Sequence, residues 1–77
     1  MTLTEAKAKF SAKINALTPE QLEAGLVHLT MIQKNRGGKL SEEERLVRAA
    51  MLERYGELFS VEAEDALMDK LDSMLSE

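Results

Sequence analysis

Cysteine and tryptophan are absent from this 77-residue sequence, and proline, histidine and tyrosine each occur once. Without cysteine the chain has neither disulfide bonds nor thiolate ligands for a metal. No apolar run approaches the roughly 20 residues of a membrane-spanning helix, and we expect no signal peptide because the first residues lack its charged-then-apolar pattern. We therefore expect one small cytoplasmic domain, residues 1–77, with no membrane association. It should bury only about 60% of the surface that its unfolded chain exposes.

Side chains that carry catalysis are also scarce. His28 is the only histidine, and one imidazole cannot supply the ligand set of a zinc site. No serine or threonine lies in a motif that would activate it as a nucleophile. The pair Gly37-Gly38 is not followed by the Lys-Ser/Thr that completes a phosphate-binding P-loop. The sequence thus predicts a protein that is not an enzyme and has no metal or cofactor.

The charges that are present divide unevenly along the chain. Residues 1–39 carry six basic and three acidic side chains, whereas residues 40–77 carry four basic and eleven acidic ones, for a net charge of −4. An acidic chain does not attract nucleic-acid phosphates, which are bound by lysine and arginine. The asymmetry suits head-to-tail self-association, and the acidic second half favours a partner with a basic surface.

Helix starts are marked by capping residues. Thr18 with Gln21, and Ser41 with Glu44, have the spacing of capping boxes, in which the side chain of each partner bonds the other's backbone amide. Ser60 precedes a third start that is rich in first-turn acids. A weaker fourth start combines Thr2 with Glu5. These signals predict four helices.

Helix ends fall where these starts require them. Gly37 after the second helix can adopt the left-handed backbone of a C-terminal cap, and Gly56 is expected to do the same after Tyr55. Pro19 forces the preceding helix to end near Leu17. No segment alternates with the period of two that a strand requires. The sequence therefore predicts an all-α fold, a compact bundle of four short helices at about 3–16, 19–35, 42–55 and 61–75.

The two middle helices carry apolar residues on two sides. In the segment 19–35, Val27 and Met31 lie opposite the main apolar face. In the segment 42–55, Leu52 and Tyr55 lie opposite the main apolar face of that helix. A helix that is apolar on two sides is either buried between neighbours or contacts another chain. Either the middle helices form a central hairpin wrapped by the outer two, or one of the second faces binds a partner.

This surplus of apolar surface indicates a small, non-enzymatic protein-interaction module. Tyrosine, arginine and methionine are enriched at interfaces. We expect it to self-associate as a homo-oligomer and to act as a regulator or inhibitor by binding another protein. Its size and lack of motifs suit a phage or bacterial protein.

In the alternative interpretation Leu52 and Tyr55 only pack beneath the turn at 56–59. The predicted protein-binding residues are Val27, Met31, Arg45, Arg48, Leu52 and Tyr55.

Two alternatives involve nucleic acid. The middle helices and their connection could form a helical nucleic-acid-binding regulator, although the three glutamates that open the third helix would face phosphates. The acidic last helix could instead mimic a nucleic acid and bind a nucleic-acid-binding protein. For the first alternative the candidate residues are Lys34, Arg36, Lys39, Arg45 and Arg48.

Overall fold

The computed structural model describes residues 3–76, which contain helices and no strand. The all-α fold predicted from the sequence is therefore confirmed. The start expected at Thr2 lies outside the described residues. Helix α1 spans Leu3–Asn15, α2 spans Pro19–Asn35, α3 spans Glu42–Leu58 and α4 spans Val61–Ser76.

The other three helix starts form as the capping residues predict. The Thr18 hydroxyl accepts a hydrogen bond from the Gln21 amide at 3.2 Å, and the Gln21 side chain accepts one from the Thr18 amide at 2.9 Å. Ser41 and Glu44 form the same reciprocal pair at 3.1 and 2.9 Å. The Ser60 hydroxyl accepts from the amide three residues later, at 3.1 Å. Each cap satisfies backbone donors that a helix start leaves unpaired.

The predicted glycine stop at the end of α2 is also confirmed. Gly37 and Gly38 have φ values of +73° and +92°, a region that side chains with a β-carbon rarely adopt. The Gly38 amide donates to the Gln33 carbonyl at 2.8 Å, and the Gly37 amide donates to the Lys34 carbonyl at 3.2 Å. This pair of bonds is the Schellman motif, which satisfies the last carbonyls of a helix.

The predicted end of the third helix at Tyr55 is wrong. Helix α3 continues through Gly56 to Leu58, and Gly56 does not have a positive φ. Its lack of a β-carbon serves a different purpose, because a β-carbon there would lie 2.5 Å from an Oε atom of Glu64. Gly56 therefore lets the first turn of α4 approach α3 closely, and it does not end the helix.

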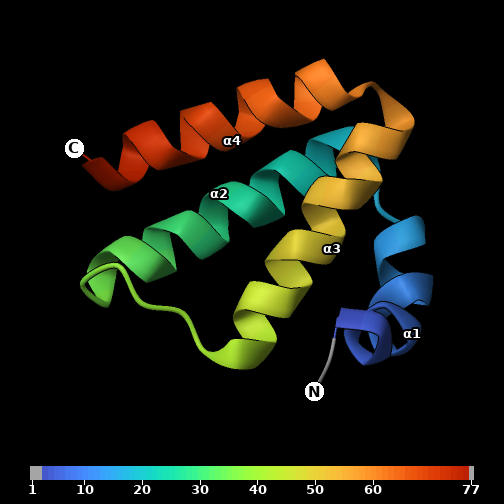
Figure 1. Cartoon of the computed structure of the whole chain (residues 1–77), viewed down its shortest axis with the longest axis horizontal. Helices are drawn as coiled ribbons and strands as arrows, with labels where there is room; N and C mark the ends of the chain where they lie inside the picture. The colour runs from blue at the N-terminus through green and yellow to red at the C-terminus, as the bar shows by residue number, and fades with distance from the viewer. Residues whose placement is uncertain (1–2, 77) are drawn as a thin grey trace.

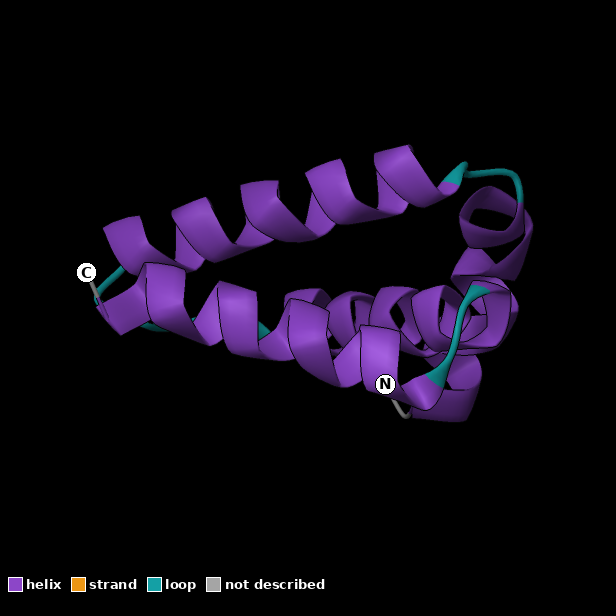
Figure 2. Ribbon diagram, turned by 90° about the horizontal axis from the view of Figure 1, so that it is seen from above, coloured by secondary structure: helices purple, strands orange, loops and turns teal. Residues whose placement is uncertain are grey.

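Helix α3 occupies the centre of the molecule. It packs against each of the other three helices, and α4 also packs against α2 (Figure 1). Helices α2 and α4 run in the same direction, from the end of the molecule where α1 lies toward the end with the C-terminus (Figures 1 and 2). Of the two arrangements left open by the sequence, this one resembles the central hairpin, with α4 covering both middle helices and α1 covering α3.

The core draws on all four helices. Three consecutive residues of α3, Ala50, Met51 and Leu52, are buried, so α3 is covered on more than one side, as a central helix must be. Thr30 is the one buried polar residue among those described, and its hydroxyl donates to the Leu26 carbonyl at 2.9 Å. The buried apolar residues are Ile14, Leu22, Leu26, Ala50, Met51, Leu52, Leu67 and Leu71.

Candidate protein-interaction site

A cluster of apolar side chains is exposed where α3 turns into α4. Leu58 is 39% exposed, Phe59 54% and Val61 66%. Only Phe59 and Ser60 separate the two helices, at the upper right of Figure 1. We call Tyr55, Leu58, Phe59 and Val61 the α3–α4 corner.

The aromatic rings of the corner hold each other in place. The Tyr55 and Phe59 ring centroids are 4.8 Å apart, with the ring planes tilted by 49°. The Phe59 amide donates to the Tyr55 carbonyl at 3.1 Å. Tyr55 is half-buried and packs against the core. Phe59 thus presents more than half of its surface from a fixed support, which lowers the entropy lost when a partner covers it.

A pocket of about 280 Å³ adjoins the corner through Tyr55. Its apolar lining comes from Tyr55 and from Ala63, Ala66 and Leu67 of α4. At its rim, Lys70 Nζ of α4 lies 3.0 Å from Glu23 Oε1 of α2, a bond between exposed side chains. The corner and this pocket share Tyr55, and the pocket combines an apolar lining with a charged rim, which is the usual composition of a protein interface.

The sequence analysis did not predict this surface, because it considered Leu58 and Phe59 only as part of a turn that packs over Tyr55. A detectable signal was present. Three large apolar residues occur within four positions around the cap Ser60. A tight two-residue turn has no room to bury them all, and turns are normally polar.

The six predicted protein-binding residues do not share one surface. Leu52 is 4% exposed and belongs to the core, so a partner cannot contact it in this arrangement. Tyr55 lies at the corner, while Val27 is half-buried and packs against the core. Met31 is 54% exposed and lines a separate pocket of about 230 Å³ with Met74 of α4.

The two remaining predicted residues, Arg45 and Arg48, line a pocket near the opposite end of the molecule. Its volume is about 290 Å³, and we call it the basic pocket. Among the residues that the structure describes, neither guanidinium has an ion-pair partner, and the Nε atom of Arg48 is buried without a hydrogen-bond partner. Asp72 is the one acidic residue of the lining, which consists of Gln33, Leu40, Arg45, Arg48, Asp72 and Leu75.

The other residues of the nucleic-acid alternative do not line this pocket: Lys34 lines the pocket that contains Met31, and Arg36 and Lys39 belong to the connection between α2 and α3. Arg36 is paired with the Glu44 carboxylate, while Lys34 and Lys39 are exposed. The pKa of Glu44 is lowered, chiefly by the hydrogen bond from the Ser41 amide, with further contributions from the Ser41 hydroxyl and Arg36. Glu44 is therefore ionised at neutral pH, and its ion pair with Arg36 removes one cation from the set that could bind a phosphate.

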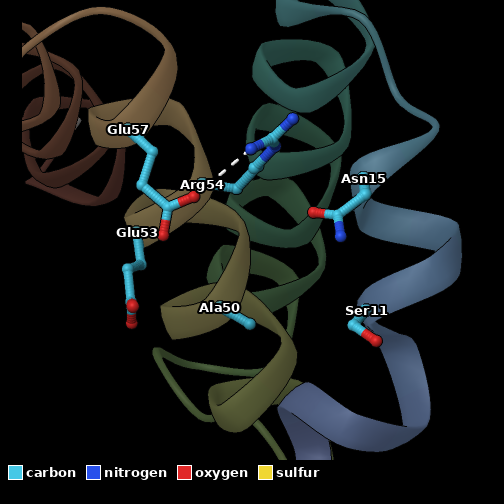
Figure 3. Close-up of a pocket in the computed structure, with 6 residues that line it drawn as sticks. All are labelled: Ser11, Asn15, Ala50, Glu53, Arg54 and Glu57. Atoms are coloured by element: carbon cyan, nitrogen blue, oxygen red, sulfur yellow. Dashed lines mark hydrogen bonds and ion pairs between the residues drawn. The ribbon is translucent and has the colours of Figure 1, made fainter.

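A third pocket, of about 240 Å³, lies between α1 and α3 (Figure 3). Asn15 points from α1 toward α3, where Arg54 is joined to Glu57 by an ion pair of 3.3 Å. The Ser11 hydroxyl at this pocket donates to its own helix, to the Ala8 carbonyl at 3.4 Å. No histidine is available to activate it, because the sole histidine is on α2. The pocket offers polar contacts but no set of groups for nucleophilic catalysis.

Within residues 3–76, no three His, Asp or Glu side chains are grouped so that they could hold a metal ion. No described helix has both the length and the apolar character needed to cross a membrane. Comparisons with protein-family models, with curated proteins and with solved structures found no match to this chain.

Proposed function

We propose that this chain is a small protein-interaction module that self-associates and acts as a regulator or inhibitor by binding another protein. The observation that supports this function best is the exposed α3–α4 corner. It presents three large apolar side chains around a two-residue turn, beside an apolar pocket. Exposed apolar clusters with polar margins are typical of interaction sites.

The proposed mechanism is burial of the corner against a partner. Phe59 supplies the largest exposed apolar side chain, and its contact with Tyr55 fixes its position. A well-packed aromatic residue of this kind often dominates the binding energy of an interface. Leu58 and Val61 then surround it and exclude water from the contact.

The test measures the solution mass of the chain and of two matched variants by light scattering across a dilution series. Phe59→Ser removes the apolar side chain of the corner, and Met31→Ser removes one of equal fractional exposure elsewhere, since both are 54% exposed. We expect the unmodified chain and Met31→Ser to associate, and Phe59→Ser to remain monomeric with unchanged helix content by circular dichroism. Equal association of all three proteins would exclude the corner as the interface.

A further inference from the structure

The α2–α3 segment and the α3–α4 corner differ in the sign of the charges that have no ion-pair partner among the described residues. At the α2–α3 end, each acidic residue in the first turn of α3 has an interaction partner. Glu44 forms an ion pair with Arg36 and Glu43 one with Lys9 at 3.8 Å, and Glu42 is not without a partner either. Lys34, Lys39, Arg45 and Arg48 make no ion pair with any described residue. The free side-chain charges of this segment, from Lys34 to Arg48, are therefore cationic.

The opposite is true beside the α3–α4 corner. Arg54, the basic residue nearest in sequence, is paired with Glu57 at 3.3 Å. Glu62 and Asp65 are exposed and have no ion-pair partner in the described part of the chain. Asp65 follows Val61 by one helical turn, so it lies on the same side of α4 as the exposed valine. The free charges next to the apolar corner are therefore carboxylates.

Figure 1 shows that these two regions lie at opposite ends of the molecule. The α2–α3 loop and the C-terminal end of α4, which bound the basic pocket, are at the left, and the α3–α4 corner is at the upper right. The basic pocket also has apolar lining, because Leu40 and Leu75 contribute to it. One end thus presents apolar side chains with free carboxylates. The other presents a hollow with apolar walls, where the two guanidinium groups of Arg45 and Arg48 outnumber the one carboxylate of Asp72.

We propose that the chain assembles head to tail, with the α3–α4 corner of one copy docked in the basic pocket of the next. This inference rests on the proposed function and specifies its partner as a second copy. Glu62 and Asp65 of one copy would pair with Arg45 and Arg48 of the other while Phe59 packs between Leu40 and Leu75.

Charge complementarity disfavours the symmetric alternative. A twofold dimer that joined corner to corner would bring Glu62 and Asp65 close to the same carboxylates of the partner, and like charges at an interface cost binding energy. A head-to-tail contact is heterologous, so it leaves one free corner and one free pocket on every assembly that does not close into a ring. The association is therefore expected to extend beyond two chains and to weaken as salt screens the charges.

The decisive experiment mixes two variants that are defective at opposite ends. The corner variant carries Phe59→Ser with Val61→Ser, and the pocket variant carries Arg45→Glu. Arg45 is exposed and makes no ion pair with a described residue, so its replacement leaves the fold intact. Circular dichroism confirms folding of each variant, and light scattering at low salt measures the mass of each protein alone and of the equimolar mixture.

We expect each variant alone to be monomeric and the mixture to form a species of two chains and no larger. The intact corner of the pocket variant binds the intact pocket of the corner variant, and the two defective ends block further growth. If the pocket variant still associates on its own and only the corner variant is monomeric, the corner binds another corner. Head-to-tail assembly is then wrong, although the protein-interaction function survives. If the unmodified chain is monomeric at every concentration and at low salt, self-association itself is wrong.

Discussion

Gly56 of α3 lies directly beneath the carboxyl group of Glu64 of α4. A β-carbon at position 56 would lie 2.5 Å from Glu64 Oε2 and 3.2 Å from Glu64 Cδ. The nearest atom belongs to the end of a flexible side chain, so the carboxyl group can rotate away. The glycine that the sequence marks as a helix stop is thus an interior position of a longer helix, in close contact with α4.

Replacing this glycine should stabilise the domain. In a helix interior alanine is favoured over glycine by about 1 kcal/mol, and the displaced carboxyl group offsets part of that gain. We therefore expect Gly56→Ala to raise the free energy of unfolding by less than about 1 kcal/mol, measured by urea denaturation. A loss of stability would show that Glu64 cannot move aside.

Gly37→Ala should have the opposite effect. The φ of Gly37 is +73°, and the space where a β-carbon would stand is open, so the backbone conformation alone determines the cost. A left-handed conformation costs a residue with a β-carbon roughly 1–2 kcal/mol. The same urea experiment should show a loss of about that size. An unchanged midpoint would contradict the Schellman ending of α2.

Glu44 should make the stability of the domain depend on pH in the acid range. Its pKa in the folded chain is lowered by the Ser41 amide and hydroxyl and by Arg36. The carboxylate therefore stabilises the fold fully above the ordinary glutamate pKa of 4.5, and this contribution is lost as the pH falls through the lowered value. We expect Glu44→Gln to be less stable than the unmodified chain at neutral pH, with the difference vanishing in strong acid. A constant difference across the acid titration would contradict this assignment.

Leu52→Ala should affect the whole fold and not a binding surface alone. Leu52 is 4% exposed, and truncating a buried leucine to alanine typically costs 2–5 kcal/mol. A domain of this length has a total stability of only about 4–12 kcal/mol. Thermal denaturation should show a large fall in the midpoint. If the midpoint is unchanged while association is lost, Leu52 is an interface residue after all.

The nucleic-acid alternative leads to a separate prediction. Arg36 is engaged by Glu44, and Asp72 lies with Arg45 in the basic pocket. We therefore expect the unmodified chain to leave a DNA fragment unretarded in a gel, even at about 50 mM salt, where phosphate contacts are strong. Retardation that Lys39→Glu with Arg45→Glu abolishes would favour the alternative instead.

The fold could be predicted from short-range signals because the capping residues act locally. Thr18, Ser41 and Ser60 each bond an amide three residues away, so their neighbours in sequence determine the start of each helix. The end of α3 could not be predicted in this way. Gly56 continues the helix without a positive φ, and its close approach to Glu64 of α4 is a tertiary contact that local signals do not show.

The candidate site was harder to predict for the same reason. Helical periodicity places Leu52 and Tyr55 on one side of α3, but only the packing of the neighbouring helices decides that Leu52 is buried and Tyr55 half-exposed. Periodicity also gives no indication that Phe59 remains exposed on the turn. Arg45 and Arg48 share a face by their spacing, and the structure places them in a pocket completed by residues of α4.

The most direct test of self-association through the corner is the solution mass of the unmodified chain, measured by light scattering on a sizing column across a dilution series at low salt. We predict a mass that rises with concentration beyond that of one 8.6 kDa chain and falls when salt is added. A mass of one chain at every concentration would contradict self-association through the corner.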